Sequence, residues 1–219
     1  IAETEKYAHI TYFLNGGTEM SFEGEDRILV PSPSGGHYEL NPEMSADKIT
    51  ENVLENLRKY HFIAVNFANA DMVGHTGDFE ATAKAIEKVD GCVGKIASMV
   101  LELGGATIVT SDHGNAEEKI YKFSGENKTK HSLNPVPFFL IGQDFKSSEP
   151  LSREAVAQKY KETLGTLSDI APTVLELLGL EAPEEVEENE RLARVYDMHA
   201  RRILEVHDDN ASALERPLP

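Results

Sequence analysis

The chain has 219 residues, 40% hydrophobic and 27% charged, so it can bury a core and is not an intrinsically disordered chain. Its formal net charge of −17 repels phosphate backbones, which argues against nucleic acid as a partner. The single cysteine, Cys92, rules out an intramolecular disulfide and favours a reducing compartment, the cytoplasm. We find no run of 18 apolar residues and no signal peptide, so the sequence predicts neither a membrane partner nor secretion. Because the first residue is Ile1 rather than Met, we expect the chain to begin partway into a longer protein.

The elements predicted in chain order alternate between strands and helices. They are strands at 9–14 and 27–31, a helix at 45–59, a strand at 62–67, a helix from 79 to the glycine pair at 104–105, strands at 106–110 and 136–141, and a helix at 169–178. Gly91 and Gly94 inside the long helix cost helix stability, so we expect a close packing contact there. Strands separated by helical crossovers predict an α/β fold, with a mainly parallel sheet and helices on both faces. A charged, amphipathic helical tail is expected at 184–219, separate from a domain at 1–183.

Potential metal ligands cluster beside three of these strands. Asp71 and His75 lie in the loop predicted after the strand at 62–67, while Asp112 and His113 follow the strand at 106–110. His131 precedes the strand at 136–141. The stretch DHGN alone would indicate a polar turn, but the shared position at one sheet edge, where open α/β sheets bind ligands, favours a metal site. Carboxylate and imidazole ligands suit Mn²⁺ or Zn²⁺ better than Ca²⁺.

The adjacent pair Asp112 and His113 indicates two ions rather than one. Neighbouring side chains diverge, so they serve a single ion poorly and two ions a few ångströms apart more naturally. This interpretation predicts a centre with two metal ions at the sheet edge.

Several long motifs resemble the cofactor-independent (2,3-bisphosphoglycerate-independent) phosphoglycerate mutases of the alkaline phosphatase superfamily. The motifs are NADMVGHTGD, SDHGNAEE, the opening IAETEKYAHITYFLNGG, VPSP at 30–33 and NPEMSA at 41–46. The resemblance runs from Ile1 to about Pro183 and implies an alkaline-phosphatase-like fold. It also implies a metal-dependent isomerase of glycolysis and gluconeogenesis that interconverts 3-phosphoglycerate and 2-phosphoglycerate through a phosphoserine.

The resemblance also implies a ligand set. One of two Mn²⁺ ions, for which Zn²⁺, Co²⁺ or Mg²⁺ are alternatives, is held by Asp71, His75 and His131. The second ion is held by Asp112 and His113, together with an aspartate and the nucleophilic serine. Lys6 lies near the transferred phosphate. The stretch KHS at 130–132 departs from the family, which more often has a small residue before the histidine and a threonine after it.

Other parts of the implied enzyme are missing from this sequence. The resemblance places the serine and its companion aspartate in an N-terminal piece, and the substrate-gripping arginines in an inserted domain. We therefore assign no catalytic residue here, expect the fold to be incomplete without an N-terminal segment, and expect no activity from this chain alone. The full-length protein is expected to be a monomer that binds phosphoglycerate. A stand-alone, non-catalytic metal-binding domain, or another metal-dependent phosphomutase or phosphohydrolase of the same superfamily, remains an alternative.

Overall fold

The computed structural model describes residues 1–181 except 122, 147–151, 160–162 and 164. The chain divides into two compact units, which we describe separately. The first unit comprises residues 1–103 and 111–136, and the second comprises 104–110 and the described residues from 137 onward. The tail helix predicted at 184–219 lies outside the described residues.

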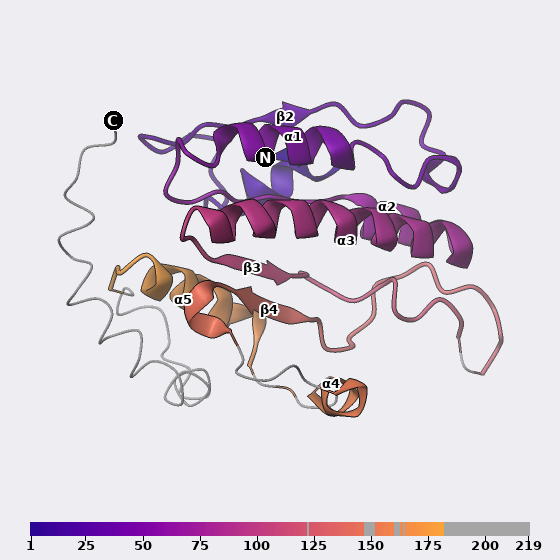
Figure 1. Ribbon diagram of the computed structural model, residues 1–219. Coiled ribbons are helices and arrows are strands. Elements are labelled where there is room, and N and C mark those ends of the chain that lie inside the picture. The colour runs from indigo at the N-terminus through magenta and orange to yellow at the C-terminus, as the bar shows by residue number, and fades with distance from the viewer. Residues whose placement is uncertain (122, 147–151, 160–162, 164, 182–219) are drawn as a thin grey trace. The chain divides into compact units, whose positions relative to one another are not determined.

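The first unit combines short parallel strands with three α-helices (Figure 1). Its elements are β1 (Ala2–Glu3), the 3₁₀ helix η1 (Thr4–Ile10), β2 (Leu29–Val30), the 3₁₀ helix η2 (Tyr38–Leu40), α1 (Ala46–Asn56), α2 (Asn69–Gly74) and α3 (Phe79–Glu102). β1 pairs in parallel with β2, and Ala2 also forms a parallel bridge with Asn66. The strand predicted at 27–31 is therefore present over two residues, and the one predicted at 62–67 is reduced to the Asn66 bridge.

One face of α1 builds the core of this unit. Ile49 and Val53 are fully buried and pack with Val30 and Ile96, which lies on α3. The helix predicted at 45–59 is confirmed, with apolar residues spaced along one face as the sequence indicates. Ser45 precedes the helix, but its hydroxyl donates to a loop carbonyl instead of capping the helix.

The predicted long helix is also confirmed, as α3. Asp78 caps its N-terminus by accepting a hydrogen bond from the Ala81 N–H at 2.8 Å. The expected packing contact at Gly91 and Gly94 is wrong, because a Cβ atom at either position would meet nothing within 4 Å. Cys92 between them is buried.

The strand predicted at 9–14 is wrong. Residues 4–10 form η1 and a turn follows, because the backbone finds local partners: the Phe13 N–H donates to Ala8 O at 3.0 Å, and the Asn15 N–H donates to Thr11 O at 2.9 Å. The Thr11 hydroxyl adds a hydrogen bond to Tyr7 O. Alternating apolar residues here reflect a locally satisfied turn rather than a strand.

The segment NADMVG, interpreted from sequence as a loop, forms α2 instead. The Asn69 side chain fixes the start of this helix by donating to the carbonyls of Pro42 and Glu43. The helix matters for function because residues four apart lie on one helical face. Asp71 and His75 stand in that relation.

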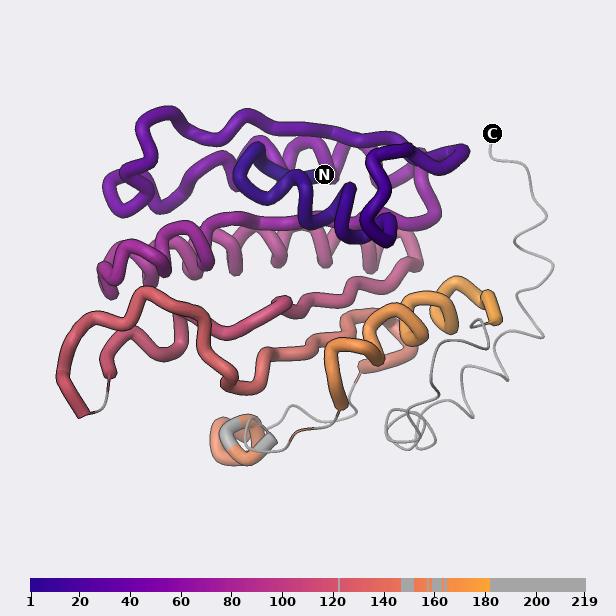
Figure 2. The backbone as a smooth tube through the Cα atoms, turned by 180° about the vertical axis from the view of Figure 1, so that it is seen from behind, coloured from indigo at the N-terminus to yellow at the C-terminus, as the bar shows by residue number. Residues whose placement is uncertain are grey.

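The second unit contains a two-stranded sheet and short helices. Its elements are β3 (Thr107–Thr110), β4 (Phe138–Ile141), the 3₁₀ helix η3 (Gln143–Phe145), α4 (Arg153–Lys159), the 3₁₀ helix η4 (Leu167–Asp169) and α5 (Ile170–Leu177). β3 and β4 are antiparallel and run side by side in both views (Figures 1 and 2). The predicted parallel pairing holds for β1 and β2 but is wrong for β3 and β4. Parallel pairing of β3 and β4 would require a crossover, and no helix lies in the described part of the 111–137 connection.

The helix predicted at 169–178 is confirmed as η4 and α5. Gly179, at φ +68°, ends it in the left-handed conformation, and the Leu180 N–H donates to Leu175 O at 2.9 Å. Small sheets with interspersed helices in the described residues agree with a partial α/β domain. None of the described helices is long and apolar enough to cross a membrane.

We predict that Ile49→Ala lowers the free energy of unfolding by about 2–5 kcal/mol, because it opens a cavity beneath α1. The matched control is Leu40→Ala, because Leu40 is 80% exposed and its loss should change stability by less than about 0.5 kcal/mol. Urea denaturation followed by far-UV circular dichroism measures both. Equal losses would contradict the assignment of the core.

Candidate metal centre

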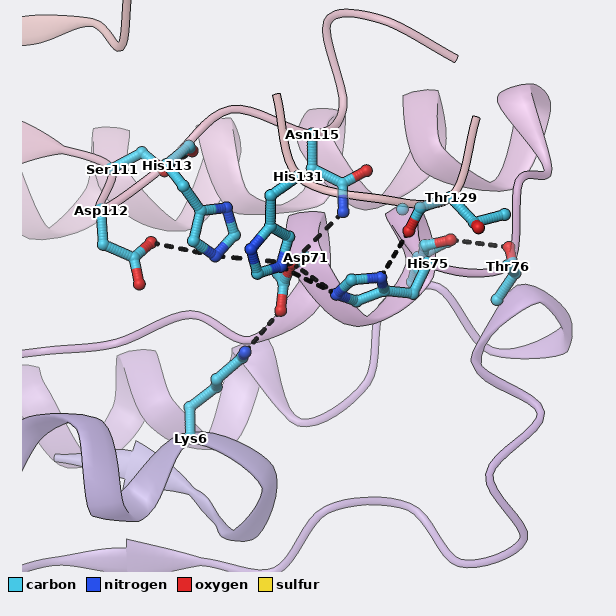
Figure 3. A network of polar contacts seen from close by, with 12 residues as sticks. Lys6, Asp71, His75, Thr76, Ser111, Asp112, His113, Asn115, Thr129 and His131 are labelled. Atoms are coloured by element: carbon cyan, nitrogen blue, oxygen red, sulfur yellow. Dashed lines mark hydrogen bonds and ion pairs between the residues drawn. The ribbon is translucent and has the colours of Figure 1, made fainter. Parts of the chain in front are cut away.

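One carboxylate oxygen lies at the centre of the candidate site (Figure 3). Asp71 Oδ1 is 3.0 Å from His75 Nε2, 3.3 Å from His131 Nε2 and 3.7 Å from His113 Nε2. The Asp71 side chain is largely buried, whereas the side chains of His75 and His131 are 41% and 48% exposed. The site is therefore anchored in the protein and open on one side to solvent.

Three parts of the first unit deliver these side chains. Helix α2 presents Asp71 and His75 one turn apart, and η1 presents Lys6. His113 and His131 lie on two arms of the loop at 111–136. An antiparallel bridge joins the arms, in which the N–H of residue 132 donates to the carbonyl of residue 114 at 2.7 Å. The geometry of α2 and the closure of this loop thus bring Asp71 and His131 together, although they lie 60 positions apart in the sequence.

Hydrogen bonding fixes the tautomer of His75. Its Nδ1 lies 2.6 Å from the carbonyl oxygen of Thr129, which can only accept, so Nδ1 carries a proton and the neutral ring has its free lone pair on Nε2. That lone pair faces Asp71 Oδ1 and, at 3.1 Å, His131 Nε2. A metal ion between these atoms could therefore take a lone pair from His75 Nε2 and from the Asp71 carboxylate.

His113 completes a compact donor set with the same carboxylate. The ligand atoms of Asp71, His113 and His131 all lie within 4.8 Å of one another. The rings of His113 and His131 stack with centroids 3.5 Å apart, and His113 Nδ1 is buried with no hydrogen-bond partner among the described residues. Asp71 and His131 thus belong to two overlapping donor sets, one completed by His75 and the other by His113. Imidazole nitrogen and carboxylate oxygen together fit Mn²⁺, Zn²⁺ or Co²⁺.

Asp112 lies at the edge of the cluster. Its side chain is 62% exposed, and its Oδ1 is 3.6 Å from His113 Nε2. The structure therefore brings together Asp71, His75, His113 and His131 closely, with the exposed Asp112 beside His113 (Figure 3). An exposed carboxylate of this kind can still ligate a second ion beside His113.

Lys6 forms an ion pair with the other oxygen of Asp71, Oδ2. Burial alone would raise the pKa of Asp71, but the hydrogen bond and charge of Lys6 and the neighbouring histidines lower it overall. The carboxylate is therefore ionised at neutral pH. Ionisation is what both a metal ligand and a lysine partner require.

A polar network behind the ligands joins both arms of the loop. The Asn115 N–H donates to Glu117 Oε2 at 2.7 Å, and Glu117 Oε1 accepts from Ser132 and Asn134. Burial alone would raise the pKa of Glu117, but the donors from Ser132 and Asn134 lower it overall. Asn115 and Glu117 thus support the loops that carry His113 and His131. Lys119, a buried lysine in the same network, was missed, because nothing in EEK distinguishes it from a solvated lysine.

Comparison with known proteins agrees with this donor chemistry. Residues 1–182 match the family model described as the metalloenzyme superfamily. The chain is 51% identical over 187 residues to the 2,3-bisphosphoglycerate-independent phosphoglycerate mutase of Clostridioides difficile, covering 84% of this chain and 34% of that protein. It is 52% identical over 188 residues to phosphoglycerate mutase 1 of the same type from Methanosarcina barkeri, covering 85% and 34%.

A solved structure shares the fold. A crystal structure of Leishmania mexicana phosphoglycerate mutase at low cobalt concentration superposes with a TM-score of 0.71 and 33% identity. The match covers 85% of this chain and 36% of that one. The predicted alkaline-phosphatase-like fold is thereby confirmed. The chain spans about a third of the length of the relatives that it matches.

We predict that Gly114→Ala destabilises the site, because the new Cβ would lie 2.2 Å from Ser132 Oγ and 2.5 Å from Glu117 Oε1. Forcing the two loop arms apart should lower the free energy of unfolding by about 1–3 kcal/mol. The control is Gly91→Ala on the exposed face of α3, which meets nothing and should raise stability by roughly 0.5–1 kcal/mol. Thermal unfolding of both variants tests the difference in sign, and a neutral Gly114→Ala would refute the close approach.

Proposed function

Because the chain belongs to the metalloenzyme superfamily, we propose that it is the C-terminal metal-binding portion of a cofactor-independent phosphoglycerate mutase. The complete enzyme would interconvert 3-phosphoglycerate and 2-phosphoglycerate through a phosphoserine, as an isomerase of glycolysis and gluconeogenesis in the cytoplasm. Residues 1–183 would form part of its phosphatase domain, with 184–219 as a tail. The observation that carries the proposal is the convergence of three imidazoles on Asp71 Oδ1.

The relatives support the choice of reaction. Those from Clostridioides difficile and Methanosarcina barkeri are named as 2,3-bisphosphoglycerate-independent phosphoglycerate mutases, and each is about half identical to this chain over its matching part. The preparation of the Leishmania mexicana structure with cobalt supports a divalent transition metal. Phosphoglycerate is accordingly the proposed small-molecule partner, and the full-length protein is proposed to be a monomer.

Two Mn²⁺ ions are the proposed cofactors, with Zn²⁺, Co²⁺ or Mg²⁺ as alternatives. Asp71, His75 and His131 would hold the first ion. Asp112 and His113 would hold the second, together with ligands outside this chain. Because His113 also lies within reach of Asp71, the two sites would adjoin each other. When bound, such ions neutralise phosphoryl oxygens and lower the pKa of a coordinated hydroxyl.

The side chains of this chain then have distinct tasks. Asp71 supplies the anionic ligand, and the Thr129 carbonyl orients His75 so that Nε2 faces the site. Lys6, which reaches the same carboxylate from η1, supplies a positive charge where a substrate phosphate would approach. In a chain of net charge −17, this local concentration of cationic and metal-binding groups makes an anionic substrate acceptable.

We predict that the chain binds Mn²⁺ more tightly at the first proposed site, because the second lacks ligands from outside this chain. His75→Ala should weaken binding at the first site. Removal of a direct ligand should cost at least as much as loss of an outer hydrogen-bonding partner, about 10–100-fold in affinity. Isothermal titration calorimetry measures the change, with His37→Ala as the control because the His37 side chain is 76% exposed and pairs with Glu39 rather than with a proposed ligand. Full affinity and stoichiometry in His75→Ala would refute the ligand assignment.

We also predict that these 219 residues alone do not interconvert the phosphoglycerates. The proposed nucleophilic serine lies outside this chain, and losing the nucleophile of a covalent mechanism costs about a millionfold in rate. A coupled assay for 2-phosphoglycerate formation with Mn²⁺ measures turnover, using His75→Ala as the background. Turnover clearly above that background would mean that a serine within this chain serves as the nucleophile. The remaining two-thirds of a relative can also be added to the assay as a separate chain. If this chain binds metal but the mixture stays inactive, the alternative of a non-catalytic metal-binding domain is favoured.

A further inference from the structure

A buried lysine lies behind the metal ligands. Lys119 is only 5% exposed, and its Nζ donates to Gly74 O at 2.5 Å and to Asn115 Oδ1. Lysine is seldom fully buried, because desolvation of its ammonium group is costly unless acceptors offset it. Here one acceptor is the last carbonyl of α2, and the other is the amide that contacts Asp71.

The ammonium group decides how the Asn115 amide is oriented. An amide side chain can present either its oxygen or its NH₂ group, and only its partners decide between them. Since the ammonium can only donate, Asn115 must turn Oδ1 toward Lys119, which directs Nδ2 toward Asp71. Nδ2 donates to Asp71 Oδ1 at 3.3 Å, the same oxygen on which the histidines converge.

We propose that Lys119 is a positioning residue for the metal centre: through Asn115 it holds the Asp71 carboxylate so that Oδ1 points at the histidines. The inference rests on the proposed function, because the carboxylate being positioned is the proposed ligand. Gly74 belongs to the same device. A Cβ atom there would lie 2.7 Å from Asn115 Oδ1, so only glycine lets the amide pack against the end of α2.

The direction of the effect separates positioning from simple electrostatics. Removing a positive charge near a cation site strengthens cation binding by Coulomb's law. Loss of a positioning residue weakens binding, because the carboxylate is no longer held in the ligating orientation. Lys119→Met removes the charge and both donated hydrogen bonds while keeping an unbranched side chain, so the sign of the change in affinity is decisive.

The test is calorimetric titration of the whole chain with Mn²⁺, comparing the unsubstituted protein, Lys119→Met and Lys128→Met. Lys128 is the matched control, because it lies on the same loop and pairs with Glu118 at 2.5 Å without contacting the ligand set. We expect Lys119→Met to bind Mn²⁺ about tenfold more weakly or worse, and Lys128→Met to bind as tightly as the unsubstituted chain or slightly more tightly. The visible absorption of saturating Co²⁺ should change in Lys119→Met alone, which a loss of stability elsewhere would not produce.

Gly74→Ala keeps the proposal testable if Lys119→Met does not fold. This variant changes no charge and favours helix formation, yet it pushes the Asn115 amide out of place, so it should also weaken Mn²⁺ binding about tenfold. Unchanged or tighter Mn²⁺ binding by a folded Lys119→Met, or by Gly74→Ala in its place, would overturn the inference while leaving the proposed function intact. Failure of the unsubstituted chain to bind Mn²⁺ would instead overturn both.

Discussion

The candidate site depends on one partly buried carboxylate, that of Asp71. Burial of an ionised acid is costly unless charges and hydrogen bonds offset it. In this chain a lysine faces one oxygen, while three imidazoles and an amide face the other. The acid therefore organises its neighbours, and Lys6, His75 and His113 in turn lower its pKa and keep it ionised. The same arrangement concentrates nitrogen donors around one anionic oxygen, which is the requirement for binding a transition-metal ion.

No single element supplies this arrangement. A helix gives the spacing of Asp71 and His75, a 3₁₀ helix gives Lys6, and the two arms of one loop give the other histidines. The arms stay together because the backbone closes at Gly114, where a side chain would strike Ser132 and Glu117. The chemistry of the site is thus tied to close backbone approaches that the fold must maintain, and stability and metal affinity should respond together when those approaches are disturbed.

The long helices and the ligand motifs could be predicted from the sequence. Helices α1 and α3 have clear apolar faces, and the ligand motifs are long enough to be identified without a structure. The prediction of a strand at 9–14 is wrong because local hydrogen bonds in a turn satisfy the backbone N–H groups there, which the pattern of apolar residues does not reveal. The segment holding Asp71 was interpreted as a loop because six residues carry too little periodicity to indicate a helix. The contact of the Thr129 carbonyl with His75 and the burial of Lys119 could not be predicted from composition or from residue spacing. These contacts depend on tertiary closure.

Anomalous diffraction from crystals of this chain soaked in Mn²⁺ tests the central claim most directly. The account predicts a manganese peak within coordination distance of Asp71 Oδ1 and of Nε2 of His75 and His131, with any second, weaker peak beside Asp112 and His113. A manganese peak elsewhere on the surface, with none at Asp71, would contradict the account.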